Sequence, residues 1–128
     1  MTKKPFSIKA RLKSFTYAFQ GWKVLIGEEH NARIHLASAI MAIIAGVLLK
    51  ISSLEWIVIV LAISIVFAAE AFNSAIEYLC NFVSPQYHEL IKKIKDLTAL
   101  AVLFIAAGAL VSGLIIFLPK ILNLCLSY

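Results

Sequence analysis

Three long apolar runs restrict what this chain of 128 residues can fold into. They extend from Ile34 to Leu49, from Leu54 to Val83 and from Leu97 to Leu118. A helix of about 20 apolar residues spans the ~30 Å hydrocarbon core of a bilayer. The first run approaches this length when it is extended back through Asn31. The pattern predicts an all-α integral membrane protein with one domain (1–128), whose three transmembrane helices occupy approximately 31–49, 54–83 and 91–118.

Composition supports the same class. The chain is 62% hydrophobic and 15% charged, whereas soluble domains are typically ~45–50% apolar and ~25% charged. So few polar groups cannot cover a soluble particle of this size. The net charge of +5 could indicate a nucleic-acid partner, but the basic residues follow the ends of the apolar runs, which argues against one.

The segment 1–29 predicts an amphipathic helix that lies flat in the membrane interface. Its apolar residues recur at spacings of three and four, which places them on one side of a helix. Lys9, Lys13 and Lys23 lie beside that stripe. A basic helix with an aromatic apolar face is typical of the interface. The stripe consists of Ile8, Leu12, Phe15, Phe19, Trp22 and Ile26.

The charged residues predict an orientation. Ten of the 12 Lys and Arg residues precede the first run or lie between the second and third, and only Lys50 and Lys120 do not. The positive-inside rule then places the N-terminus and the second loop in the cytoplasm and the C-terminus outside. Six of the seven acidic residues lie near the same cytoplasmic ends, with Glu55 as the exception. This gathering of charge indicates a polar site at one membrane face.

The stretch from Glu70 to Glu77 carries the most chemical information. On a helix, Glu70, Asn73, Ser74, Glu77 and Asn81 share one face. Ionisable side chains within a membrane span normally face a protein interior or a water-filled cavity. A polar seam between helices is the structural alternative. Two carboxylates without a basic residue on the same face make a poor seam, so we favour a functional site.

Hard oxygen ligands suit Mg²⁺, which usually takes one or two carboxylates together with phosphate oxygens. Glu77 lies near the interface, and Glu28 and Glu29 end the amphipathic helix at a similar depth. Glu77, together with Glu28 or Glu29, could hold Mg²⁺ against ATP. Glu70 is deeper, and an apolar setting makes a carboxylate a stronger proton acceptor. A P-loop motif is absent, so these patterns alone indicate a metal-assisted membrane site and do not establish a kinase.

The residues Glu70–Glu77 (EAFNSAIE), Tyr87–Leu90 (YHEL) and the pair Lys95-Asp96 resemble the small prokaryotic diacylglycerol kinase family, which includes diacylglycerol kinases and undecaprenol kinases. The resemblance covers nearly the whole chain. It implies a homotrimer in the bacterial inner membrane, with active sites between neighbouring subunits. It also implies Mg²⁺-dependent transfer of the ATP γ-phosphate to a lipid hydroxyl, either of diacylglycerol, giving phosphatidic acid, or of undecaprenol.

Roles follow by matching the motifs. Glu70 resembles the general base, which meets the lipid substrate beside Ser74, and Asn73 resembles a polar residue that supports the site. Glu29 and Glu77 resemble metal ligands that also meet the nucleotide. The other residues that resemble nucleotide contacts are Tyr17, Gln86, Tyr87, His88, Lys95, Asp96 and, uncertain by one position, Arg11. Many family members have an aspartate where this chain has Asn81, so a charge-dependent role there is in doubt.

Two other function classes are considered. A small oligomeric transporter could bind protons or cations at Glu70 and Glu77, and a scaffold subunit would need no chemistry. A transport pathway requires access from both sides, but the acidic groups crowd one side. The lipid kinase is therefore the favoured interpretation. The segment from Asn31 to Leu36 is more similar to the undecaprenol branch than to the diacylglycerol branch, and the acceptor stays open between them.

Overall fold

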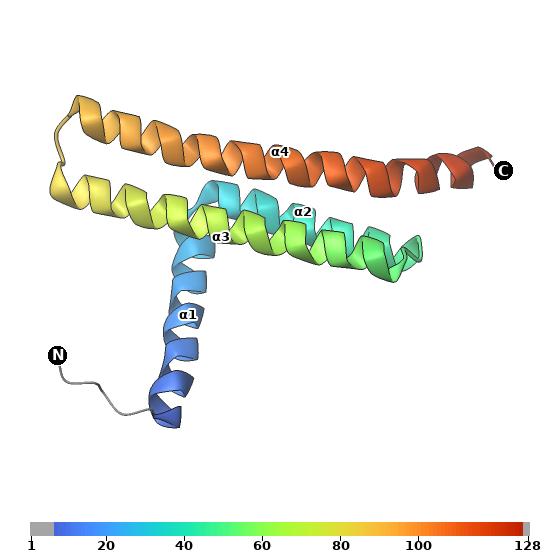
Figure 1. Cartoon of the computed structure of the whole chain (residues 1–128), viewed down its shortest axis with the longest axis horizontal. Helices are drawn as coiled ribbons and strands as arrows, with labels where there is room; N and C mark the ends of the chain where they lie inside the picture. Colours follow the sequence, from blue (N-terminus) through green and yellow to red (C-terminus); the bar gives the residue numbers. More distant parts are fainter. Residues whose placement is uncertain (1–6, 127–128) are drawn as a thin grey trace.

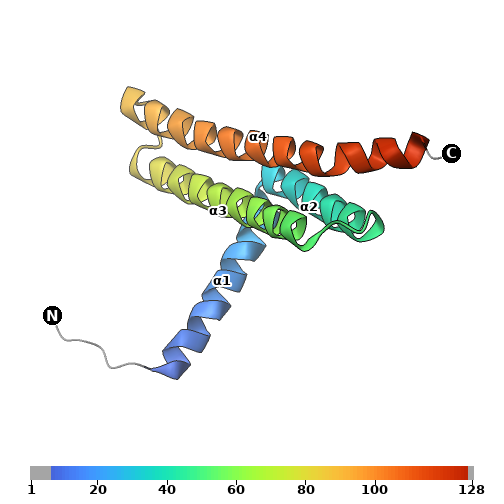
Figure 2. The ribbon, with the colours of Figure 1, turned by 45° about the vertical axis from the view of Figure 1, so that its right-hand side comes forward.

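The computed structural model describes residues 7–126, and the described chain is entirely helical (Figure 1). The helices are α1 (Ile8–Glu28), α2 (His30–Leu48), α3 (Ser53–Val83) and α4 (Glu89–Leu126). The helices α2, α3 and α4 lie side by side, whereas α1 leaves them at a steep angle in both views (Figures 1 and 2). The helices α2, α3 and α4 are long and apolar enough to cross a membrane. The all-α prediction with three candidate spans is confirmed.

The corner between α1 and α2 is set by Glu29, which has an extended backbone and separates the two helices. The last carbonyls of a helix lack partners inside it. Here the Arg33 guanidinium reaches back from α2, and its Nε donates to the Ile26 carbonyl at 2.8 Å while a second nitrogen donates to the Gly27 carbonyl. A cation at the C-terminal end of a helix also complements the helix dipole. Arg33 therefore fixes the corner that carries Glu28 and Glu29.

The turn between α2 and α3 forms the opposite end of the bundle. Ser52 starts α3 with a capping box, in which its hydroxyl accepts from the Glu55 N–H and the Glu55 carboxylate accepts from the Ser52 N–H. Beside this turn α2 and α3 pack closely, because a Cβ on Gly46 would lie only 2.8 Å from the Trp56 ring. Glycine at this position lets α2 and α3 approach each other.

The helix α4 is longer than the third expected segment, since it begins at Glu89 and continues through Pro119 to Leu126. Proline removes one backbone N–H and normally kinks or ends a helix. The loss is limited to the bond that would reach the Ile115 carbonyl, and proline is tolerated in membrane helices where neighbouring groups compensate. The helix continues past Pro119 into Lys120 and Ile121 in spite of this missing bond.

Apolar side chains cover the outside of the spans rather than a large core. Phe72 and Phe104 are 71% and 70% exposed, and many leucines and isoleucines of the spans are exposed as well. A small buried cluster of Ile51, Ile59 and Ile116 lies near the turn between α2 and α3. An apolar surface of this extent would be unfavourable in water, but it is the ordinary surface of a protein solvated by lipid.

Candidate functional site

The most deeply buried ionisable side chain in the described chain is Glu70, which is 2% exposed and lies in the middle of α3. Its Oε1 atom lies 3.1 Å from Nε2 of His35 on α2. The contact has ion-pair distance, but its alignment falls short of a hydrogen bond. Glu29 is also near enough for its charge to interact with that of Glu70. A buried carboxylate with one titratable contact can act as an acid or a base.

The corner between α1 and α2 is joined to α3 by Tyr78. The Tyr78 hydroxyl lies 2.9 Å from Oε2 of Glu28 and 3.2 Å from Oε1 of Glu29, and it donates its single proton between them. Tyr78 follows Glu77 directly, so the two acidic segments that sequence reasoning paired are brought to the same end of the spans. Glu29 and Glu77 therefore lie at the same end of the spans.

The helix α4 joins the site through Lys95. Its ammonium group lies 3.4 Å from Oε1 of Glu77 and donates a 2.9 Å hydrogen bond to Oδ1 of Asn81. The neutral amide of Asn81 therefore still accepts from the lysine, although it does not carry the charge of an aspartate. Lys95 is 35% exposed and Glu77 is 45% exposed, so both groups are accessible from the end of the bundle.

The two carboxylates on the polar face of α3 therefore meet partners on neighbouring helices. His35 of α2 meets Glu70, and Lys95 of α4 meets Glu77. The side chain of Ser74 is buried between these two levels, and its hydroxyl has no hydrogen-bond partner in the described chain. Asn73 is partly buried. An unpaired buried hydroxyl is unusual in a native structure and often marks a binding position.

A groove of about 490 Å³ leads to this face between α1 and α3. Ser74 lines it, and Tyr78 lies at the same end as the carboxylates. One wall is stiffened by Trp22, whose ring centroid lies 4.9 Å from that of Phe67 in an edge-to-face arrangement. Small residues leave the space open, and these are Ala18, Gly21, Ala68, Ala71 and Ala75.

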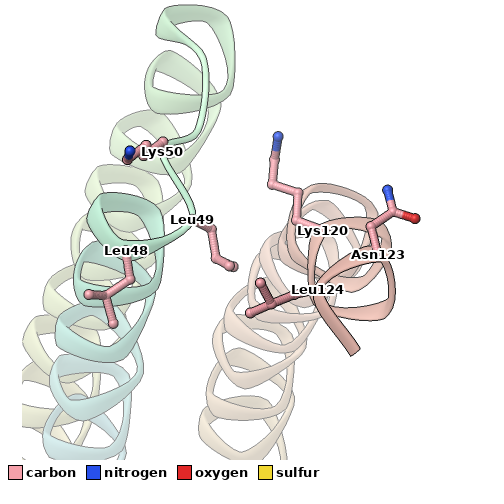
Figure 3. Close-up of a pocket in the computed structure, with 6 residues that line it drawn as sticks. All are labelled: Leu48, Leu49, Lys50, Lys120, Asn123 and Leu124. Atoms are coloured by element: carbon pink, nitrogen blue, oxygen red, sulfur yellow. The ribbon is translucent and has the colours of Figure 1, made fainter. Parts of the chain in front are cut away.

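A second pocket, of about 450 Å³, lies at the opposite end of the spans (Figure 3). Lys50 and Lys120 line it, but their side chains point in different directions (Figure 3). Lys120 is already paired with Glu55 at 3.2 Å. Without convergent polar groups, this pocket has the character of a helix end and not of a reaction site.

The loop between α3 and α4 contains Gln86, Tyr87 and His88, which sequence reasoning assigned to the nucleotide. His88 precedes α4, and its Nδ1 accepts from the Leu90 N–H at 3.2 Å, so it caps the helix. Tyr87 is 81% exposed. Asp96 lies on α4 and pairs with Lys92 at 2.5 Å. All four predicted residues lie at the end of the bundle that carries Glu77.

Tyr17 and Arg11 are not brought to the carboxylates of the same chain. They lie 12 and 18 residues before Glu29 on α1, which corresponds to about 18 Å and 27 Å along a straight helix. Figure 1 shows this helix leaving the three spans. Tyr17 is exposed, and the Lys13 ammonium lies 5.8 Å from its ring centroid.

Sequence reasoning did not assign roles to three residues that organise the site, namely His35, Tyr78 and Arg33. A polar residue inside an apolar run was a usable signal for His35, and a basic residue directly before that run was one for Arg33. The spacing of polar residues did not reveal Tyr78, because tyrosine is common at membrane interfaces for other reasons. Each of the three joins two helices, so its partner is decided by how the helices pack.

Three lipid-exposed helices, with a buried carboxylate and further charged groups towards one end, define a small multi-pass membrane protein with a polar site at that end. Within residues 7–126, no group of three or more His, Cys, Asp or Glu side chains is placed to hold a metal alone. A site of one or two carboxylates completed by phosphate oxygens remains compatible with this arrangement.

A family profile described as prokaryotic diacylglycerol kinase matches residues 16–117. The chain is 38% identical to an undecaprenol kinase of Bacillus subtilis over 85% of this chain and 89% of that protein. It is 35% identical to a diacylglycerol kinase of Synechocystis sp. over 88% of this chain and 65% of that protein. A diacylglycerol kinase of Escherichia coli is 24% identical over 82% of this chain and 86% of that protein. The chain therefore belongs to the prokaryotic diacylglycerol kinase family, and it is a lipid kinase of the membrane.

Membership of this family confirms the resemblance drawn from the motifs. The relatives named above are lipid kinases, and a transporter is not supported.

Proposed function

We propose that this enzyme transfers the γ-phosphate of ATP to the hydroxyl of a membrane lipid alcohol, either diacylglycerol or undecaprenol, in an Mg²⁺-dependent reaction. The observation that carries the proposal is Glu70, a carboxylate buried in a membrane span beside His35. A lipid hydroxyl reaches such a depth without leaving the bilayer. The relatives named above act on these same two classes of alcohol by name.

Glu70 is the general base and removes the hydroxyl proton as the oxygen attacks the γ-phosphorus. Asn73, one turn away on the same face, supports the site as a neutral polar group. Phosphoryl transfer depends mainly on positioning and on stabilising negative charge. A proton acceptor beside the lipid hydroxyl, and cations nearer the end of the spans, separate these two tasks in space.

Glu29 and Glu77 hold the cation and meet the nucleotide. Their carboxylate oxygens fit Mg²⁺. Glu29 accepts a hydrogen bond from Tyr78, and Glu77 precedes Tyr78 on α3. When bound, Mg²⁺ supplies positive charge at the β- and γ-phosphates. Lys95 adds a second cation, because it already reaches Glu77. Asp96 and the loop residues Gln86, Tyr87 and His88 complete the nucleotide side.

Tyr17 and Arg11 contact the nucleotide of a neighbouring subunit in a homotrimer. Their separation from Glu29 along α1 supports this, because a helix cannot return them to its own C-terminal end. The steep angle between α1 and the spans fits a helix that lies in the membrane surface. Small residues on α4, such as Gly108 and Gly113, have open space at the Cβ position and permit close helix contacts.

The enzyme lies in the bacterial inner membrane with its N-terminus in the cytoplasm and its C-terminus outside. The distribution of lysine and arginine supports this orientation. The nucleotide side of the site then faces the compartment that holds ATP.

Phosphate transfer from labelled ATP, with the purified protein in mixed micelles, tests the function directly. Diacylglycerol and undecaprenol are supplied separately, with Mg²⁺ and with a chelator. We expect labelling of one lipid that disappears when Mg²⁺ is removed. If a folded trimer labels neither lipid, the proposed acceptors are wrong. If labelling persists with the chelator, the metal requirement is wrong.

The groove between α1 and α3 holds the part of the lipid chain next to the hydroxyl. We expect Gly21→Leu to raise the KM for the lipid by about tenfold, because the new side chain enters open space along this groove. The KM for ATP should not change. Gly27→Leu is the matched control, since Gly27 also has open space but does not line the groove. An equal effect of both substitutions would contradict this position for the lipid.

A further inference from the structure

The buried position of Glu70 raises a question that the proposed reaction does not answer. In each catalytic cycle a base accepts one proton, and it must lose that proton before the next cycle. Glu70 is only 2% exposed, so direct exchange with bulk water is restricted. We propose that His35 receives this proton from Glu70 and passes it to water at the membrane interface, so that His35 acts as a proton relay. This inference rests on the proposed role of Glu70 as base.

The geometry around Glu70 favours His35 for this task. His35 Nε2 lies 3.1 Å from Glu70 Oε1, and the His35 side chain is 22% exposed. It therefore contacts the buried carboxylate, is itself partly exposed, and lies in the second turn of α2, close to the corner that carries Glu29. A neutral imidazole ring can accept a proton on one nitrogen and release one from the other.

The other groups around Glu70 are less suitable. Ser74 is buried, and its hydroxyl has no partner through which a proton could continue. Asn73 does not titrate. Glu77 is two turns away, about 10 Å along α3, and Lys95 occupies one of its oxygens. Glu29 approaches Glu70 from the corner between α1 and α2, and its charge acts on Glu70 through space. Within residues 7–126, His35 is the ionisable side chain that contacts Glu70 directly.

The proton balance is simple. The lipid O–H bond breaks, its proton passes to Glu70, and the oxygen forms a bond to the γ-phosphorus while the bond from that phosphorus to the ADP oxygen breaks. The proton on Glu70 then moves to the lone pair of His35 Nε2. His35 releases its other ring proton from Nδ1 to water, and exchange of the ring tautomer restores the starting state. No electrons are transferred, and the only co-reactant is water.

Two substitutions separate a relay from a residue that only positions Glu70. His35→Ala removes the ring, whereas His35→Gln keeps an N–H group near the place of Nε2 but cannot relay a proton. A relay predicts that both variants complete the first turnover at nearly the normal rate and then slow down. Rapid-quench measurement of lipid phosphorylation should show a burst of one phosphate per site, followed by a steady state reduced by about tenfold or more. The KM for Mg-ATP should stay within about twofold.

Added imidazole gives a second readout, which a structural role would not affect. In the His35→Ala variant, imidazole should enter the vacated space and restore the steady-state rate in a concentration-dependent way. It should not accelerate the wild-type enzyme. Trimer content and ATP binding are measured in parallel, and His35→Gln provides the test if the alanine variant does not fold.

Three results would overturn the relay. One is a normal steady-state rate in both variants. Another is full activity of His35→Gln with loss of activity only in His35→Ala, which would reduce His35 to a positioning residue. The third is slowing of the first turnover itself with no response to imidazole. The function proposed for Glu70 is tested separately, because Glu70→Gln should abolish the burst as well. If Glu70→Gln retains the burst, the base assignment fails, whatever His35 does.

Discussion

Glu70→Gln should abolish lipid phosphorylation while the protein still folds and binds Mg-ATP. Glutamine has nearly the same shape, so the packing around this side chain, which is 2% exposed, is kept. It cannot accept the proton of the lipid hydroxyl. General base catalysis contributes about 10²–10⁴-fold to a rate, and we expect a loss of kcat within or above this range. The measurement is the initial rate of lipid phosphorylation at saturating ATP and lipid.

The matched control is Glu55→Gln. Glu55 lies on the same helix but at the opposite end, where it caps α3 and pairs with Lys120. Glutamine retains hydrogen-bonding oxygen at the cap, so any effect should be on stability and should be small. Activity within about twofold of wild type is expected, since no phosphate chemistry occurs at that end. Full activity of Glu70→Gln would remove Glu70 as the base, and equal losses in both variants would indicate a general effect of charge removal.

The sequence was enough to predict that Glu70 and Glu55 belong to different ends of the spans. Ten of the 12 lysines and arginines gather at the ends of the spans near Glu70 and Glu77, whereas Glu55 lies at the other end with Lys50 and Lys120. Helical periodicity placed Glu70, Ser74 and Glu77 on one face, and the structure buries Glu70 and Ser74 on that face. The helices themselves follow from the apolar runs, because a backbone in lipid must satisfy its own hydrogen bonds.

The side chains of neighbouring helices that contact the polar face of α3 could not be predicted from the sequence. Periodicity tells which side of one helix is polar, but it does not fix how the next helix is rotated about its axis. The contact from His35 to Glu70 and the contact from Lys95 to Glu77 therefore depend on packing between helices. The argument that two carboxylates without a basic residue on their own face make a poor seam took no account of these side chains. Two of the missing positive or protonatable groups come from α2 and α4.

The corner at Glu29 shows the same limit. Its break between α1 and α2 has no proline, and it is held by a guanidinium that reaches back to two carbonyls of α1. Such a return contact spans six or seven residues and has no short sequence motif. At Pro119 the local sequence instead predicts a helix end, but the residue lies inside α4. At both positions the backbone in the folded chain differs from the one that the neighbouring sequence predicts.

Glu77→Gln should weaken binding of Mg-ATP by about tenfold or more, which corresponds to about 1.4 kcal/mol or more of binding free energy. The substitution removes one of the two carboxylates proposed to hold the cation. It also removes the partner of Lys95, which lies 3.4 Å away in the free enzyme. Lys95 keeps its hydrogen bond to Asn81 and gains freedom to meet a phosphate. Loss of the carboxylate should weaken binding of Mg-ATP, whereas the released Lys95 should favour binding of metal-free ATP.

This opposition distinguishes a metal ligand from a residue that only holds Lys95. If Glu77 binds the cation, the variant should lose affinity for Mg-ATP but should bind metal-free ATP as well as wild type or better, because a carboxylate near the phosphates has been removed. Fluorescent nucleotide titrations with Mg²⁺ and with a chelator measure both affinities. Glu89→Gln is the control, since Glu89 lies at the same end of the bundle and pairs with Lys93 on the surface of α4. Equal loss of both nucleotide forms in Glu77→Gln would show that the carboxylate positions Lys95 and does not bind the metal.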